Sequence, residues 1–264
     1  MLPQSQHLEL EQDGSWLTVW FNEPERRNPL TNARVDALLD LCAALPNAPI
    51  QGVTFRGRGG IFCAGGDLKS FKSSFDGPAS QDDIVRLSLR AADLFDAVAA
   101  LPQFTVMAVE GAAMAGGLGL TCIGDMIVAS EGTRFSLSET RIGLTPAQIA
   151  PFVVTRLGMP AARRLMLTGA TVDVQEAKRL GLVDQIVAPE EMDNAIEEVQ
   201  AMIRSTAPQA MATIKRQLNE MPFQTREQQR QMAAKSFAER LLSDEAKEGI
   251  SAFLNKRKPN WAGG

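Results

Sequence analysis

The chain has 264 residues, of which 45% are hydrophobic and 22% are charged, as in an ordinary globular protein. Its formal net charge of −4 argues against a dedicated nucleic-acid binder, and no apolar run approaches the roughly 20 residues that cross a membrane. With one histidine, no tyrosine and three cysteines that form no CxxC pair, the chain is poorly equipped for a zinc site or a Ser-His-Asp triad, so acid–base chemistry falls to Asp, Glu, Lys or water.

The first part of the chain alternates between strand and helix patterns. Residues 8–21 alternate apolar and polar side chains around Asp13-Gly14, which predicts a β-hairpin. Thr31 is the expected N-cap of a helix that Pro46 ends. The elements expected next are a strand, a glycine-rich loop, a mobile loop, an amphipathic helix and a buried strand, at residues 51–56, 57–70, 72–82, 83–101 and 104–109.

The segment at residues 107–120, MAVEGAAMAGGLGL, is unusually poor in side chains. Small residues in a row suit a close backbone approach or a turn into a helix. A helix that begins near Gly116 would present free N–H groups and its positive dipole end to an anion. Such an N–H can also stabilise an oxygen that becomes negative during a reaction. The segment alone leaves open the alternative of a junction used only for packing.

Strand–helix alternation continues to about residue 188 and then gives way to helices. Asp173 and Glu176 form a capping-box pattern for a helix that ends at Gly181. Strands are expected at residues 126–129, 134–137 and 182–187, and helices at 160–167 and, with breaks near Pro208 and Pro222, at 189–253. We therefore expect an α/β core with parallel strands over residues 1–188 and a helical region over residues 189–264.

Two glycine-rich segments that each follow a strand resemble the signatures of a known family. FCAGGDL at residues 62–68 and EGAAMAGGLGL at 110–120 resemble the two signatures of the crotonase, or enoyl-CoA hydratase/isomerase, superfamily. Further segments resemble this family in the same order, namely RRNPLT, GDMIVAS, FSLSETRIGL, RRLMLTGATVDVQEAKRLGLVDQIV and AFLNKRKPNW. The resemblance implies a crotonase-like spiral of ββα repeats with a C-terminal helical trimerisation region. An acyl-CoA would lie across each subunit.

The resemblance also assigns residues to the ligand. Gly66 and Gly116 would supply the two N–H groups of an oxyanion hole for the thioester oxygen. Ala64 matches the position whose backbone contacts the adenine, and Asp67 and Leu68 follow it along the ligand channel. Three basic residues are candidates for the CoA phosphates, each with a solvated surface charge as the alternative: Arg26, Lys69 and Lys256.

The acid–base position departs from the family pattern. Hydratases of this family commonly carry one glutamate after the second oxyanion glycine and another in a PExxxG stretch. The second is present here as Glu139, but Gly119 stands at the position of the first. The resemblance thus leaves Glu139 as the catalytic carboxylate, with a surface carboxylate as the alternative. Asp125 and Glu110 are nearby acids, of which Glu110 is expected to be structural, and Cys63 is expected to serve packing.

The segment after Glu139 indicates a particular subgroup of enzymes within the family. GLTPAQIAPFVVTRLG, at residues 143–158, replaces the glycine-rich stretch of the common hydratases. Together with Gly119, it resembles a bacterial subgroup that hydrates the branched thioesters isohexenylglutaconyl-CoA and 3-methylglutaconyl-CoA, in acyclic terpene and leucine catabolism. The implied activity is enoyl-CoA hydration at the α,β double bond. A Δ3,Δ2-enoyl-CoA isomerase, which needs only one carboxylate, and a non-catalytic acyl-CoA-binding subunit are the alternatives.

The sequence also leads to expectations about the compartment, the partners and the oligomeric state of the protein. The N-terminal residues lack a basic region followed by an apolar one, and the cysteines favour a reducing compartment, so we expect a cytoplasmic protein. The expected partner is the acyl-CoA substrate, without nucleic acid, membrane, metal or a separate cofactor, since the substrate itself arrives as a CoA thioester. The resemblance implies a homotrimer or a dimer of trimers.

Overall fold

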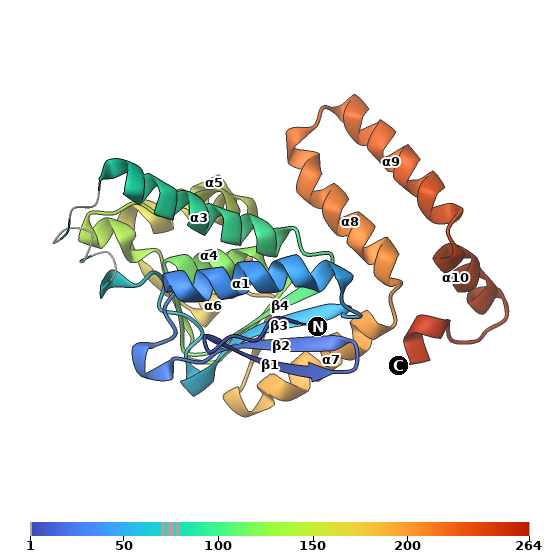
Figure 1. Ribbon diagram of the computed structural model, residues 1–264, viewed down its shortest axis with the longest axis horizontal. Coiled ribbons are helices and arrows are strands. Elements are labelled where there is room, and N and C mark those ends of the chain that lie inside the picture. The colour runs from blue at the N-terminus through green and yellow to red at the C-terminus, as the bar shows by residue number, and fades with distance from the viewer. Residues whose placement is uncertain (1, 70–71, 73–76, 78–79, 264) are drawn as a thin grey trace.

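The computed structural model describes residues 2–69, 72, 77 and 80–263 (Figure 1). The mobile loop predicted at residues 72–82 therefore falls largely outside the described residues. A six-stranded sheet forms the centre, in the order β1-β2-β3-β4-β6-β9. Its strands are β1 (Leu8–Asp13), β2 (Trp16–Phe21), β3 (Gly52–Gly57), β4 (Phe104–Val109), β6 (Met126–Ser130) and β9 (Gln185–Val187).

The strand directions agree with the sequence. The predicted hairpin is confirmed, since β1 and β2 pair antiparallel with Asp13 opposite Trp16 and Gly14 turning at a φ of 55°. All the other pairs in this sheet are parallel. A second sheet of three short strands consists of β5 (Ala112–Met114), β7 (Arg134–Ser136) and β8 (Thr171–Asp173).

Both faces of the central sheet are buried, as parallel strands require. Along β4, Met107 and Val109 belong to the main core, whereas Val106 and Ala108 face the opposite way and join a smaller core. The smaller core is completed by α7 (Met192–Arg204), which Figure 1 shows on the side of the sheet opposite α1 (Asn32–Ala44) and α3 (Gln81–Ala99). The helices over the main core are α1 (Asn32–Ala44), α3 (Gln81–Ala99), α4 (Gly116–Ile123), α5 (Ala150–Thr168) and α6 (Val174–Arg179).

Local capping explains where several helices begin. The predicted N-cap of α1 is confirmed, because the Thr31 hydroxyl accepts a hydrogen bond from the backbone N–H of Arg34 at 3.2 Å. At α6, Asp173 accepts from the N–H of Glu176 at 2.9 Å, but the predicted reciprocal bond is wrong. The Glu176 carboxylate instead pairs with Arg164 and Arg179, both at 2.6 Å.

The helix predicted to begin at Pro160 begins earlier, at Ala150. Pro151 lies in its first turn, where a missing N–H removes no helical hydrogen bond. Gly158, with a φ of 73°, interrupts the helix shortly before Pro160. The prediction therefore found only the second half of α5.

The C-terminal helices are α8 (Pro208–Glu220), α9 (Arg226–Leu241) and α10 (Asp244–Leu254), with the predicted breaks near Pro208 and Pro222 confirmed. Figure 1 shows them projecting beyond the sheet. The helix that follows residue 188, α7, packs on the sheet. The predicted boundary between two regions at this residue remains a prediction. Among the described residues, no helix is both long and apolar enough to cross a membrane.

Candidate active site

The two glycine-rich segments lie side by side in the structure. The N–H of Cys63 donates to the carbonyl of Ala112 at 3.1 Å, and the N–H of Met114 donates back to the carbonyl of Cys63 at 2.9 Å. A third segment joins them, since the N–H of Leu30 donates to the carbonyl of Gly65 at 2.8 Å. Backbone hydrogen bonds thus fix the loop of residues 62–68 beside the start of α4.

Gly66 and Gly116 face each other across this junction. A Cβ built on Gly116 would lie 3.9 Å from the backbone nitrogen of Gly66 and 3.1 Å from Cδ1 of Leu30. Ala115, with a φ of 49°, turns the chain from β5 into α4 and makes Gly116 the first helical residue. In the described part of the chain, neither the Gly66 nor the Gly116 N–H donates a hydrogen bond. Both N–H groups are therefore available to a ligand.

Both glycines line a cavity of about 430 Å³ that Glu139 also lines. Its walls come from the start of α1, from α3, from the start of α4, and from η4 (Ser138–Ile142) and η5 (Ala147–Ile149). Most of the lining is apolar, including Leu30, Val35, Ile84, Leu87, Leu94, Phe95, Leu144 and Ile149. Such a cavity suits an acyl chain whose reacting end meets a few polar groups.

Glu139 carries a buried carboxylate. Its side chain comes from η4, the residue is 9% exposed, and Oε2 has no hydrogen-bond partner among the described residues. Burial raises the pKa of Glu139, because desolvation disfavours the charged form, while a hydrogen bond from its own backbone N–H acts in the opposite direction. A carboxyl group with a raised pKa can both take and return a proton near neutral pH.

The place of the missing first glutamate is filled. A Cβ on Gly119 would lie 2.3 Å from Cγ2 and 2.7 Å from Cβ of Ile149. Ile149, at the end of η5, is 3% exposed. Residue 119 therefore has no room for a side chain, and Glu139 is the carboxylate that lines the described cavity.

The other residues predicted for the ligand lie outside this cavity. The N–H of Ala64 donates to the carbonyl of Arg27, and Leu68 and Lys69 are exposed next to the loop. Asp67 pairs with Arg26 at 2.9 Å. Lys256 is exposed and follows α10. Figure 1 shows that α10 lies far in space from α3 and α4 of the same subunit. The structure thus brings Gly66, Gly116 and Glu139 to one cavity and leaves Lys256 apart from them.

The alternative acids and the cysteine have structural surroundings. Glu110 pairs with Arg56 at 2.7 Å, as expected of a structural residue, and Asp125 pairs with Lys215 at 2.5 Å. Burial raises the pKa of the Cys63 thiol to about 11, so this cysteine stays protonated and serves packing. Within the described ranges, no group of three or more His, Cys, Asp or Glu side chains is placed to hold a metal ion.

Two cavity residues were missed in the sequence. Arg90 of α3 lines the cavity and pairs with Asp36 at 2.5 Å, and Ile149 occupies the space beside Gly119. The helical spacing around Leu87 indicated an apolar face but gave no sign that this face borders a ligand. Neither residue belongs to a motif, so only the three-dimensional arrangement reveals it.

A largely parallel sheet between helices, with two glycine-rich segments and a buried carboxylate at one cavity, is the arrangement that the resemblance to the crotonases leads us to expect. Residues 11–264 match the enoyl-CoA hydratase/isomerase family, so the chain belongs to this family and is an enzyme of the enoyl-CoA hydratase type. A protein of Thermus thermophilus assigned to the enoyl-CoA hydratases is 36% identical over 94% of this chain and 98% of its own length. The crotonase fold predicted from the sequence is confirmed.

Two solved structures show the same fold over nearly the whole chain. An enoyl-CoA hydratase/isomerase from Marinobacter aquaeolei is similar with a TM-score of 0.94 and 34% identity, over 98% of this chain and 100% of that one. Pseudomonas aeruginosa AtuE is similar with a TM-score of 0.94 and 38% identity, over 97% of this chain and 100% of that one.

Proposed function

We propose that this enzyme adds water across the α,β double bond of an acyl-CoA thioester, with Gly66 and Gly116 as oxyanion donors and Glu139 as the single acid–base group. The observation that carries the proposal is the one cavity that the two glycines and the buried Glu139 share. The CoA thioester is the substrate itself, and the reaction needs no further cofactor.

Each step follows from these positions. Ionised Glu139 takes a proton from water while the water oxygen bonds to Cβ. The electron pair of the α,β double bond forms a double bond between Cα and the thioester carbon, and the carbonyl π pair moves to the thioester oxygen. The Gly66 and Gly116 N–H groups stabilise the resulting enolate, an effect worth roughly 3–4 kcal/mol for each donor in other enzymes. Glu139 then returns its proton to Cα, which restores the carboxylate and completes the 3-hydroxyacyl product.

The second candidate function is Δ3,Δ2-enoyl-CoA isomerisation. The contact between Gly119 and Ile149 favours it, because a single carboxylate can shuttle one proton from Cα to Cγ without water. Incubation of a 3-enoyl-CoA in H₂¹⁸O distinguishes the two reactions, since isomerisation yields a 2-enoyl product without the label.

For the substrate, we propose a branched glutaconyl-CoA, either isohexenylglutaconyl-CoA or 3-methylglutaconyl-CoA. The resemblance of residues 143–158 supports this class, and the largely apolar cavity suits the branch. A glutaconyl group also carries a distal carboxylate, and Arg90 is the cation among the described lining residues. Its pairing with Asp36 leaves the side chain 49% exposed, so a second carboxylate can approach it.

A substrate panel tests this proposal. We expect a higher kcat/KM for the branched glutaconyl-CoA thioesters than for crotonyl-CoA, and Arg90→Gln should remove most of that preference. Arg86→Gln is the matched control, because Arg86 lies on the same helix, pairs with Asp83 and does not line the cavity. Equal kcat/KM values for crotonyl and glutaconyl thioesters in the unmodified enzyme would contradict the substrate assignment.

We propose a cytoplasmic homotrimer or dimer of trimers, in which Ala64 contacts the adenine and Lys69 and Lys256 reach CoA phosphates. Large exposed apolar side chains in the C-terminal helical region support assembly, because exposed apolar surface is buried when chains associate. They include Phe223 (88% exposed), Phe237 (70%), Leu242 (76%), Phe253 (83%) and Leu254 (73%). Light scattering of the purified protein tests this, and a monomer at working concentration would contradict it.

A further inference from the structure

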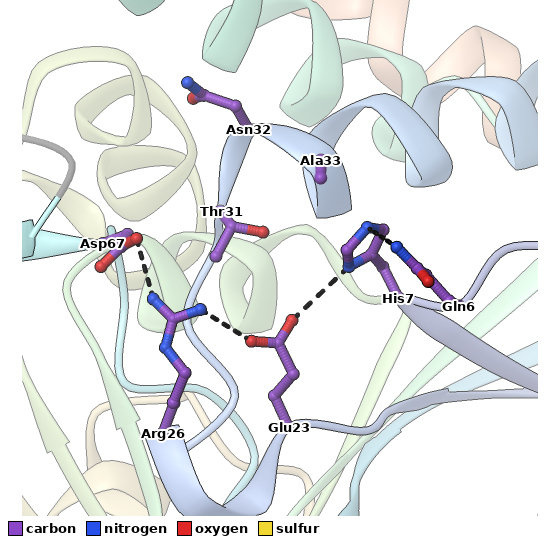
Figure 2. A pocket seen from close by; sticks show the side chains of 8 residues that line it. All are labelled: Gln6, His7, Glu23, Arg26, Thr31, Asn32, Ala33 and Asp67. Carbon is purple, nitrogen blue, oxygen red and sulfur yellow. Dashed lines mark hydrogen bonds and ion pairs between the residues drawn. The ribbon is translucent and has the colours of Figure 1, made fainter.

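Three ion pairs connect a buried arginine to the residue that follows Gly66. Arg34 is fully buried and donates to Oε1 of Glu23 at 3.0 Å. The other oxygen of Glu23 accepts from Arg26 at 2.9 Å, and Arg26 donates with its other nitrogen to Asp67 at 2.9 Å. Figure 2 shows Arg26 between the carboxylates of Glu23 and Asp67. We call these four residues the Arg34–Asp67 ion-pair chain.

Arg34, at the buried end of the ion-pair chain, is held by several hydrogen bonds. Besides Glu23, the Arg34 guanidinium donates to the backbone carbonyls of His7 and Pro29. Glu23 therefore lies against a guanidinium that is fixed by the backbone on two sides. Because the bonds of an arginine fork are directional, this arrangement also fixes the carboxylate that receives Arg26.

Asp67, at the other end of the ion-pair chain, lies in the loop that carries Gly66. One oxygen of Asp67 accepts from Arg26, and the other accepts from the backbone N–H of Lys69 at 3.2 Å. Gly65, with a φ of 91°, lies so close to β5 that a Cβ on it would be 2.7 Å from the carbonyl oxygen of Met114. Gly65 and Gly66 leave the backbone permissive. The bond from the Leu30 N–H to the Gly65 carbonyl restrains the chain before Gly66, and the Arg26–Asp67 ion pair restrains it after Gly66.

We propose that Arg26 is a positioning residue, which orients the Gly66 amide through Asp67 rather than touching the substrate. The inference rests on the proposed role of Gly66 as an oxyanion donor. Arg26 is 36% exposed, and ion pairs at such positions contribute little to global stability. A displaced oxyanion donor is far more costly, because a misplacement of about 1 Å can reduce a rate by roughly 100-fold.

The first test compares the variants Arg26→Gln, Asp67→Asn and their combination. We expect each single change to lower kcat by about 10- to 100-fold with KM little changed, because the donor acts on the transition state. The double variant should lose no more than the worse single variant, since both changes break the same link. Arg26→Lys should recover part of the loss. Arg27→Gln is the control, because the Arg27 side chain makes no ion pair or hydrogen bond among the described residues.

The second test separates this role from phosphate binding. The same variants are measured with an acyl-pantetheine, which lacks the CoA phosphates. A positioning role predicts the same fold loss in kcat with both substrates. A loss seen only with the acyl-CoA, or wild-type kcat in Arg26→Gln, would overturn the inference. Failure of the proposed function is a separate outcome, because then the unmodified enzyme itself would hydrate no acyl-CoA.

Discussion

Ile149 packs so tightly on Gly119 that a Cβ on residue 119 would lie 2.3 Å from Cγ2 of Ile149. The position of the usual first glutamate is therefore occupied by an aliphatic side chain from another segment. Glu139, whose Oε2 is buried and has no hydrogen-bond partner among the described residues, lines the same cavity as Gly66 and Gly116. The contact of Ile149 with Gly119 leaves residue 119 without room for a carboxylate side chain.

The tight contact predicts a strong coupling between the two residues. Gly119→Ala alone should lower the unfolding free energy by about 1–3 kcal/mol, the usual effect of overpacking a core. In an Ile149→Gly background the same change should have a much smaller effect, because both Cγ2 and Cβ of residue 149 are then absent. Urea unfolding of the four proteins measures this coupling, and additive losses would show that residue 119 has room.

Glu139→Gln should lower kcat by about 100- to 10,000-fold, the usual contribution of a general acid–base group. The unmodified enzyme should lose kcat/KM as the pH falls through the raised pKa of Glu139, since the protonated carboxyl cannot act as the base. A pH profile of kcat/KM checks both points. A profile with its acid limb unchanged in Glu139→Gln would assign that limb to another group.

The same pKa shift predicts an effect of pH on stability. The folded protein holds the Glu139 proton more tightly than the unfolded chain does. The contribution of Glu139 to the unfolding free energy therefore falls as the pH rises from the ordinary glutamate range through the raised pKa. The difference between the unmodified protein and Glu139→Gln, measured by urea unfolding across this range, should decrease with pH. A difference that stays constant would mean that burial does not shift this group.

Gly116→Ala tests the second oxyanion donor. The new methyl group would lie 3.9 Å from the Gly66 nitrogen and 3.1 Å from Leu30, which places it over the site with only a small clash. We expect kcat to fall by about 100- to 1,000-fold, as when an oxyanion donor is lost. The unfolding free energy should change by less than about 1 kcal/mol. Parallel kinetics and thermal unfolding measure the two effects, and a loss of stability without loss of kcat would refute the assignment.

Lys215 attaches α8 to the core. Its ammonium group pairs with Asp125 at 2.5 Å and also donates to Gln103 and Thr105, while burial lowers the pKa of Lys215. Lys215→Met should cost about 3 kcal/mol in unfolding free energy, because Asp125 loses its cation. Lys235→Met, at an exposed pair with Glu239, is the matched control and should be nearly neutral. Equal effects of the two changes would show that Lys215 does not anchor the helix.

The elements that local chemistry specifies could be predicted from the sequence. Asp13-Gly14 specifies the hairpin, Thr31 caps α1, and the small residues near Gly116 mark the turn into α4. The fold followed from motifs that extend over most of the chain. These features depend on residues that are close together in the sequence, so they can be recognised without knowledge of the fold.

The contacts between distant segments could not be predicted. Glu176 follows the capping-box pattern, yet two arginines compete successfully for its carboxylate. Arg26 has the charge to bind a phosphate, but the fold surrounds it with two carboxylates. Ile149 and Gly119 are brought together only by the packing of η5 on α4. In each case the partner, rather than the residue type, decides the outcome.

Hydration by a single glutamate is tested most directly by the uptake of label from H₂¹⁸O into the product, measured by mass spectrometry for the unmodified enzyme and for Glu139→Gln. With a branched glutaconyl-CoA, the unmodified enzyme should form a 3-hydroxyacyl-CoA that carries one ¹⁸O atom, and Glu139→Gln should form it at least about 100-fold more slowly. Labelled product at an equal rate from both proteins, or a shifted double bond without any label, would contradict hydration by a single glutamate.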